Sequence, residues 1–249
     1  MEIIVYSDGD TPLHRLDPRS RVLAAVAFSA VLALAGAWPV LLFGLLLGIA
    51  GALVARIPPA ALLQRLVPLN AVLALLLAAL LFFTPGEALF HIGPAGATRE
   101  GLQDGLIIVL KANAIVLLLA VLLGTIELVA LGHALERLGM PPKLAHLLLF
   151  TVRYLGLMLA EYSRLSTAAR LRGFAPGPNL HTLRTTGYMA GMMLVRSHAR
   201  GERIRDAMRL RGYRGSLAFH GDLAFQRSDA WFGLLSATAM LAMLGMVWP

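Results

Sequence analysis

A five-residue phrase occurs twice in the second half of the chain, and its arginines are the residues best suited to recognition chemistry. The two copies are Arg170-Leu171-Arg172-Gly173-Phe174 and Arg209-Leu210-Arg211-Gly212-Tyr213, and they lie 39 positions apart. A guanidinium is always charged and presents a planar fork of N–H donors, so it can pair with carboxylates or carbonyl groups in a groove of another protein. Two copies indicate that the chain binds two equivalent surfaces.

The repeat extends upstream of the phrase itself. Arg164 and Ala168 precede the first copy at the same offsets at which Arg203 and Ala207 precede the second. A simpler role is helix capping, because glycine is favoured just past a helix end and arginines complement the partial negative charge there. Both roles can hold together. We expect two docking points in this chain, formed by Leu171, Arg172 and Gly173 and by Leu210, Arg211 and Gly212.

Catalytic constellations are missing from the sequence. A phosphate-binding loop needs a Gly-Lys pair, but the two lysines, Lys111 and Lys143, follow leucine and proline. The seven histidines are scattered with no H-E-x-x-H among them, and the chain has no cysteine. No G-x-S-x-G is present either. We therefore expect a non-catalytic subunit that binds no metal and no cofactor of its own.

The composition is that of a polytopic membrane protein. Hydrophobic residues make up 58% of the 249 positions and charged residues 14%, and the mean hydropathy is +0.73. The first 21 residues lack an apolar core of signal-peptide length, so we expect no cleaved targeting segment. Five stretches predict transmembrane helices: Val22–Ala37, Val40–Ala55, Leu66–Phe83, Leu106–Leu123 and Ala230–Trp248.

The distribution of charge predicts an orientation. Residues 132–227 hold 15 basic against 5 acidic residues, a net charge of +10. This stretch alternates with apolar runs and lies between spans, so the positive-inside rule explains it better than nucleic-acid binding does. We expect three regions: transmembrane helices 1–4 with a cytoplasmic N-terminus in residues 1–131, a cytoplasmic region in 132–227, and a last transmembrane helix in 228–249.

Within the basic region, the pattern predicts two long amphipathic helices, from about Pro142 to Arg172 and from about His181 to Arg211, after a shorter helix from Thr125 to Leu138. Residues 144–160 are apolar enough to span a membrane. Arg153 near their middle would cost about 2.5 to 3.5 kcal/mol there, so we expect this helix beneath or partly within the bilayer.

The predicted transmembrane helices contain few polar residues. Asn70 and Asn113 are expected to join neighbouring helices by hydrogen bonds, and Lys111 is expected to reach the outer interface.

Taken together, these features resemble the transmembrane T component of energy-coupling factor (ECF) transporters, most closely the cobalt and nickel branch. The resemblance covers nearly the whole chain. His14 to Arg21 is similar to the family's N-terminal segment, although a lysine is more usual at Arg21. Arg153-Tyr154, Glu161 and the run from Ala168 to Gly173 match its Arg-aromatic, Glu, Ala, Arg-Gly series. The two Ala-Arg-Gly signatures of the family map to the repeated phrase, with leucine in place of alanine.

The resemblance implies an all-α, polytopic fold with about five transmembrane helices and long cytoplasmic coupling helices, in a prokaryotic inner membrane. It implies that Arg172 and Arg211 contact two ABC-type ATPase subunits, which bind ATP and Mg²⁺, and that Arg153, Glu161, Ala168 and Ala207 support these contacts. A separate integral membrane subunit, with a further small one in some complexes, would bind cobalt, nickel or a vitamin.

Two other classes stay open at this stage. A membrane-embedded enzyme acting on lipid head groups could use the basic region to hold phosphate, but Glu127, Glu136 and Glu161 are too dispersed to form its acid or metal constellation. A transporter or channel that works alone would favour an inverted repeat of spans, whereas the repeat here lies outside the spans.

Overall fold

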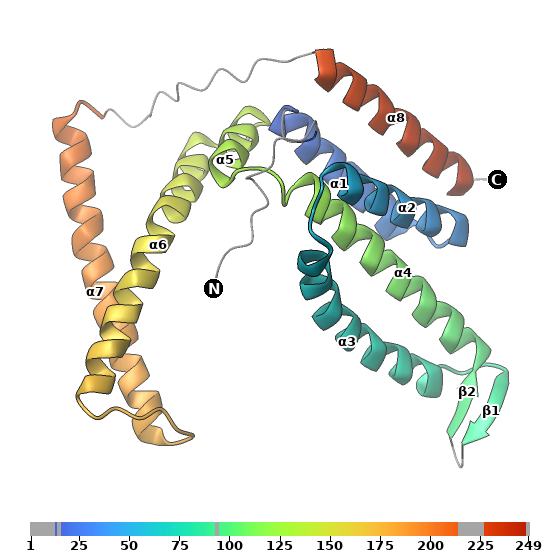
Figure 1. Ribbon diagram of the computed structural model, residues 1–249, viewed down its shortest axis with the longest axis horizontal. Coiled ribbons are helices and arrows are strands. Elements are labelled where there is room, and N and C mark those ends of the chain that lie inside the picture. Colours follow the sequence, from blue (N-terminus) through green and yellow to red (C-terminus); the bar gives the residue numbers. More distant parts are fainter. Residues whose placement is uncertain (1–12, 14–15, 93–94, 214–226, 248–249) are drawn as a thin grey trace. The chain divides into compact units, whose positions relative to one another are not determined.

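The computed structural model describes residue 13 and residues 16–92, 95–213 and 227–247, with the side chains of 88–96 and 247 left out. The expected all-α, polytopic fold is confirmed (Figure 1). The chain divides into two compact units, one of residues 1–131 with 222–249 and one of residues 132–221. The predicted roles of His14 and Arg15 lie outside the described residues.

The first unit consists of five helices that alternate in direction. Their bounds are α1 (Pro18–Leu34), α2 (Trp38–Val54), α3 (Pro59–Phe83), α4 (Arg99–Leu122) and α8 (Arg227–Val247). Asp17 caps α1 by accepting the N–H of Arg19 at 2.9 Å, and a proline follows it at the first helical position. The turn at residues 35–37, before Trp38 and Pro39, separates α1 from α2 as predicted.

Length and composition distinguish the helices that could cross a membrane. Within the described part of the chain, α3, α4, α8 and α6 (Pro142–Leu171) are long and apolar enough, and α2 is a shorter apolar helix. Helices α1 and α2 have 17 residues each, about 25 Å at 1.5 Å per residue, which is less than the roughly 30 Å of a typical hydrocarbon core. The interfacial placement of α6 stays a prediction.

The segment between α3 and α4 differs from the expected loop. It holds a short antiparallel hairpin of β1 (Ala88–Ile92) and β2 (Ala95–Thr98). Helix α4 then begins at Arg99, seven residues before the predicted span, because Thr98 caps it by accepting the N–H of Gly101 at 3.3 Å. Hydropathy marks where a helix becomes apolar, whereas the helix itself begins at its cap.

The core of the first unit lies where α1 and α2 meet α4. Phe28, Leu32, Leu41 and Leu118 are buried there. Glycines on α2 allow the close approach: a Cβ on Gly48 would lie 3.0 Å from the Cβ of Leu117. Small residues at such positions bring helix backbones into contact, which favours association inside a bilayer.

Substitution of Gly48 by valine should therefore loosen this core. The Cβ of Leu117, 3.0 Å from the added Cβ, is fixed to the backbone of α4 and cannot give way without shifting that helix, so we expect a cost of about 1–3 kcal/mol. The measurement is the thermal unfolding midpoint of the purified protein in detergent. Gly245→Val on α8 is the matched control, because a Cβ there meets nothing within 4 Å. Equal midpoints for the two variants would contradict this packing.

Buried polar groups join three helix ends in the first unit. The N–H of Asp17, before α1, donates to Oδ1 of Asp229 on α8 at 2.7 Å. The guanidinium of Arg21 donates to the hydroxyl of Thr125, just after α4. All four residues are buried. The beginnings of α1 and α8 and the end of α4 thus lie together, as the alternating topology requires, and Arg21 is an internal anchor.

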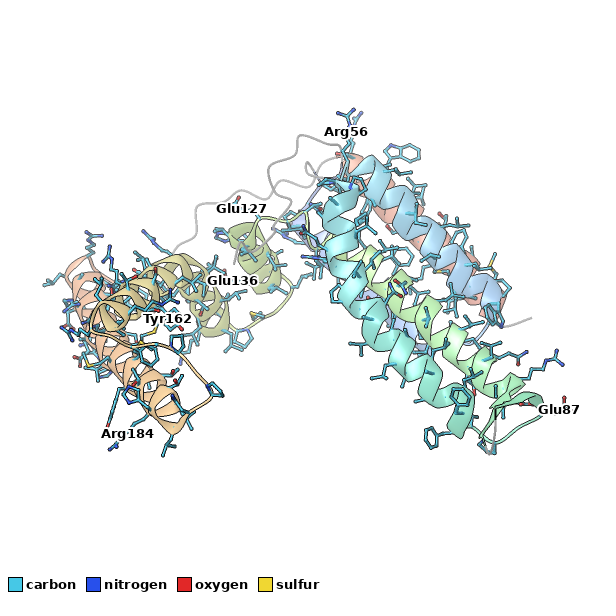
Figure 2. All side chains as sticks on the ribbon, turned by 60° about the horizontal axis from the view of Figure 1, so that its bottom comes forward. Arg56, Glu87, Glu127, Glu136, Tyr162 and Arg184 are labelled. Carbon is cyan, nitrogen blue, oxygen red and sulfur yellow. The ribbon has the colours of Figure 1, made fainter. Side chains whose placement is uncertain are left out.

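The loops at the two ends of this unit carry opposite charge. Figure 2 shows Arg56, between α2 and α3, at one end and Glu87, before the hairpin, at the other. Near the hairpin end, Lys111 on α4 donates to the carbonyl of Ala33 in the last turn of α1 at 2.9 Å, where a cation is favoured. The lysine therefore stabilises a helix end.

The asparagines join α3 to α4 as expected. Asn70 and Asn113 exchange two side-chain hydrogen bonds of 2.9 Å, and each amide also donates to the carbonyl four residues earlier. Asn70 lies two residues past Pro68, which interrupts the hydrogen bonding inside α3. Their amide groups are thus engaged within the unit.

The second unit holds two long helices, α6 and α7 (Leu180–Leu210). Both bounds agree within one residue with the predicted helices. The shorter α5 (Leu128–Arg137) precedes α6, and Pro141-Pro142 separates the two as predicted. Between α6 and α7, Asn179 caps α7 by accepting the N–H of Thr182 at 2.8 Å, and the Thr182 hydroxyl accepts the N–H of Gly177 at 2.9 Å. The Pro-Gly segment is therefore tied to the start of α7.

Candidate docking site

The two copies of the repeated phrase adopt the same backbone conformation. Arg172 and Arg211 are the C-caps of α6 and α7, with φ and ψ of −92° and 16° and of −85° and 11°. The glycine that follows has a φ of +84° in both copies. In both copies the N–H of this glycine donates to the carbonyl three residues earlier at 3.0 Å. The N–H of the aromatic residue that follows donates to the carbonyl five residues earlier, at 3.1 Å for Phe174 and 3.0 Å for Tyr213. Both helices end in a Schellman motif.

A third helix shows which part of the phrase this geometry requires. Helix α5 ends at Arg137 and is followed by Gly139, which has a φ of +104°, with equivalent hydrogen bonds of 3.1 Å from Gly139 and 3.0 Å from Met140. Its cap residue is Leu138, with no arginine there. Capping therefore accounts for the glycines and leaves the arginines of the other two caps without a structural requirement.

The residues beside the glycines are exposed at the surface of the second unit. Leu171 is 84% exposed and Leu210 is 90% exposed, and Arg172 and Arg211 are exposed as well. A leucine this exposed at the end of a helix has lost the stabilisation of burial. We call Leu171, Arg172 and Gly173 the α6 tip and Leu210, Arg211 and Gly212 the α7 tip.

The upstream part of the repeat places the same residue types on one face of each helix. Residues four apart lie on one face, so Arg164, Ala168 and Arg172 form a line on α6. Their counterparts Arg203, Ala207 and Arg211 form the same line on α7. All six are exposed. In each line an alanine stands between two arginines.

The tips lie at opposite ends of the helix pair. Helices α6 and α7 run antiparallel: the ring of Phe174, past the end of α6, lies 6.2 Å from that of His181 at the start of α7. At the other end, Tyr213 lines a pocket with Phe150 near the start of α6. Helix α7 has 31 residues, so the two tips are about 45 Å apart. One small surface could therefore not contact both tips.

An ion pair joins the helices near their crossing. The carboxylate of Glu161 on α6 contacts the guanidinium of Arg196 on α7, and it lies 3.9 Å from Arg164 on its own helix. The side chain of Glu161 is only 12% exposed, against 48% for Arg196. Glu161 thus joins the two helices midway between the tips, and its expected support of the tip contacts stays a prediction.

Charge reversal of one partner of this ion pair should weaken the contact between the helices, and charge reversal of the other partner should restore it. Glu161→Arg or Arg196→Glu alone places like charges at the crossing, whereas the double swap restores the attraction. We expect a coupling of no more than about 1 kcal/mol, because Arg196 is half exposed. The measurement is the rate of trypsin cleavage on α7 in each single variant and in the swap. No recovery in the swap would mean that the pair does not hold the helices together.

Arg153, also predicted to support the docking contacts, does not lie at either tip. Arg153 is exposed on α6 and makes no ion pair with any described residue, while its neighbour Tyr154 lines the pocket near the α7 tip. Sequence reasoning missed Arg196, since its partner lies 35 residues away and no local pattern links them. Among the described residues, no group of three or more His, Cys, Asp or Glu side chains could hold a metal ion.

Comparison with known proteins identifies the family. A family model described as CbiQ, cobalt transport protein, matches residues 9–220. An energy-coupling factor transporter transmembrane protein, EcfT, of Acidaminococcus fermentans is 27% identical over 98% of this chain and 95% of its own. The EcfT of Heliobacterium modesticaldum is 29% identical over 84% of this chain and 83% of its own. This multi-pass membrane protein therefore belongs to the CbiQ family, the transmembrane T components of energy-coupling factor transporters.

Proposed function

We propose that this chain links ATP hydrolysis in two ABC-type ATPase subunits to transport through a separate substrate-binding membrane subunit, in an importer of cobalt or nickel. One observation carries the proposal: the same arginine cap occurs at both ends of one antiparallel helix pair. A pair of ATPase subunits related by two-fold symmetry offers two copies of one surface, and a single chain can bind both only if it repeats its own contact.

The contacts are assigned to Leu171, Arg172 and Gly173 on α6 and to their counterparts Leu210, Arg211 and Gly212 on α7. Each guanidinium would pair with carboxylates or carbonyl groups in a groove of one ATPase subunit, and the exposed leucine beside it would be buried there. The ATPase subunits would bind ATP and Mg²⁺, and this chain would take no part in hydrolysis.

The helix pair would transmit motion as a lever. From Glu161 to the α6 tip the chain rises about 16 Å, and from Arg196 to the α7 tip about 22 Å, at 1.5 Å per residue. Movement of the two ATPase subunits toward or away from each other changes the angle at the crossing. Such a change couples ATP binding to transport if the substrate-binding subunit contacts the helices differently in the two arrangements.

The cargo and the membrane are proposed on separate grounds. The description of the matching family as a cobalt transport protein supports cobalt or the chemically similar nickel. The net charge of +10 over residues 132–227 supports a cytoplasmic position for this segment. The same rule supports a cytoplasmic N-terminus, and the bacterial origin of the relatives supports a prokaryotic inner membrane.

Purification from detergent tests the assembly. The tagged chain, expressed with its companion subunits, should be recovered with ATPase subunits and a small integral membrane subunit. Recovery of the chain alone would contradict the proposal. Uptake of cobalt and nickel ions by cells that express the full complex then tests the cargo, and uptake of a vitamin in place of both metals would contradict that part alone.

A further inference from the structure

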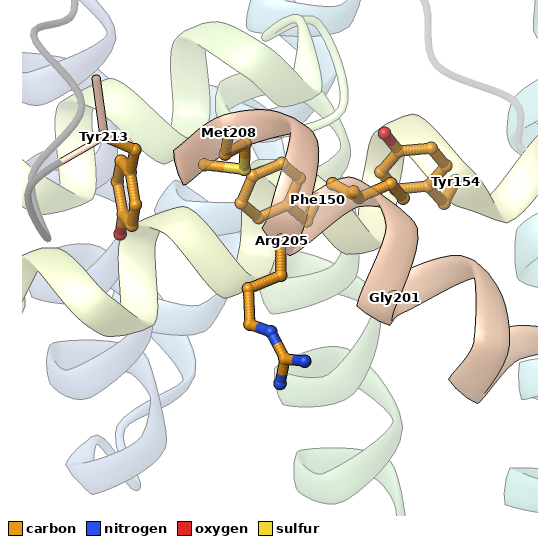
Figure 3. Close-up of a pocket in the computed structure, with 7 residues that line it drawn as sticks. Phe150, Tyr154, Gly201, Arg205, Met208 and Tyr213 are labelled. Carbon is orange, nitrogen blue, oxygen red and sulfur yellow. The ribbon is translucent and has the colours of Figure 1, made fainter. Parts of the chain in front are cut away.

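An open pocket of about 300 Å³ lies between α6 and α7 beside the α7 tip (Figure 3). Its walls come from the first half of α6, the last three turns of α7 and the second residue after the α7 cap. The lining residues are Phe150, Tyr154, Gly201, Ile204, Arg205, Met208 and Tyr213.

The chemistry of the pocket suits an apolar side chain. The rings of Phe150 and Tyr154 stack with centroids 6.2 Å apart and planes 19° apart, and Met208 is a flexible side chain that adapts to its neighbours. Arg205 turns its guanidinium away from the rings (Figure 3) and lies within 3.8 Å of the carboxylates of Glu202 and Asp206. A volume of about 300 Å³ is at the lower limit for a small-molecule site, so one large side chain is a better match.

The pocket and the α7 tip share their structural support. The N–H of Tyr213 donates to the carbonyl of Met208 at 3.0 Å, and this hydrogen bond belongs to the cap that positions Arg211. The same two residues form walls of the pocket. A protein that binds Arg211 therefore has its surface beside the pocket opening.

The charge of this end of α7 indicates the kind of surface that fits. The last three turns of α7 expose four arginines against two acidic residues, which favours an acidic partner surface. The exposed residues are Arg203, Arg205, Arg209 and Arg211, with Glu202 and Asp206. An acidic surface with one apolar side chain at its centre satisfies both the arginines and the pocket.

We infer that this pocket receives one apolar side chain of the ATPase subunit that binds the α7 tip; the inference rests on the proposed function. At the α6 tip the equivalent aromatic residue, Phe174, instead faces His181, with ring centroids 6.2 Å apart and planes 55° apart. The two tips thus have the same backbone conformation and differ in the residues around them. The apolar anchor belongs to the α7 contact.

Filling the pocket from within tests this assignment. Gly201 lines the pocket, and a Cβ placed on it meets nothing within 4 Å, so Gly201→Leu occupies the space without a clash in the chain. Gly191→Leu is the matched control, because it lies on the same helix, also meets nothing within 4 Å and is not among the lining residues. The readout is cross-linking to the ATPase subunits from a cysteine at Leu210 or at Leu171 in the intact complex. The chain has no native cysteine.

Gly201→Leu should lower cross-linking from the α7 tip about tenfold or more, the effect of losing a central interface contact, while cross-linking from the α6 tip is kept. Equal cross-linking in Gly201→Leu and Gly191→Leu would overturn the inference. So would loss of the substrate-binding membrane subunit with ATPase cross-linking kept, because the occupant would then be that subunit. Arg211→Glu separates the two proposals: if it has no effect on α7 cross-linking, the proposed function fails, whereas a loss with Arg211→Glu but not with Gly201→Leu removes only the pocket contact.

Discussion

Reversal of both cap arginines, Arg172→Glu with Arg211→Glu, should abolish binding of the ATPase subunits and transport, while the chain remains folded in the membrane. Each arginine is exposed in the free chain, so its loss removes no internal contact. In the complex each reversal places a carboxylate against groups that accept hydrogen bonds, which typically costs 2–5 kcal/mol or more at an interface. A single reversal leaves one tip attached and should weaken binding by roughly 10²–10⁴-fold, the gain that two linked contacts give over one.

The measurement is the amount of ATPase subunit that co-purifies, together with uptake by cells that express the full complex. Arg184→Glu is the control for reversal of Arg211 alone, because Arg184 lies on α7, is exposed and makes its contact with Tyr188, far from the α7 tip. Arg172→Lys and Arg211→Lys should retain part of the binding, since lysine keeps the charge but not the planar fork. Normal uptake in the double reversal would contradict the docking assignment.

Replacement of both cap glycines, Gly173→Val with Gly212→Val, should have the second large effect. Both glycines have a φ of +84°, a conformation that costs residues with a side chain about 1–2 kcal/mol and is a genuine outlier for valine. A Cβ meets nothing within 4 Å at either position, so the cost is entirely in the backbone. The last turns should unwind and carry the arginines out of position.

Gly139→Val distinguishes capping from docking. Its φ of +104° and its open surroundings match those of the other two glycines, but the arginine is missing from its cap. Valine at each of the three positions should lower the thermal unfolding midpoint by a similar amount. Only Gly173→Val and Gly212→Val should reduce the amount of ATPase subunit that co-purifies. Asparagine at the two tips should be milder, because it tolerates this conformation. Equal loss of co-purification in Gly139→Val would indicate general unfolding.

Local signals were sufficient to predict the long helices of the second unit. Pro142 begins α6, and Gly173 and Gly212 follow the caps of α6 and α7, because proline and glycine act on the backbone within a few residues of themselves. The apolar runs likewise predicted the polytopic fold. Hydropathy did not predict the start of α4 at Arg99, since its first turns are polar and depend on the Thr98 cap.

Contacts between distant residues could not be read from the sequence. Glu161 and Arg196 meet only because α6 and α7 cross near their middles, and Asp17 and Asp229 meet although 212 positions separate them. The pocket beside the α7 tip forms for the same reason, from Phe150 and Tyr154 on one helix and Met208 on the other. Such sites depend on the register of two helices, whereas the arginine caps depend on one helix end each.

Cross-linking from both tips of one molecule tests the central claim most directly. A variant with cysteine at Leu171 and at Leu210, which are 84% and 90% exposed, would be cross-linked in the assembled complex and its products separated by mass. We predict a product that contains one copy of this chain and two ATPase subunits, with cross-linked peptides from both cysteines. Cross-links that join neither cysteine to an ATPase subunit, or that join both to a single subunit, would contradict the account.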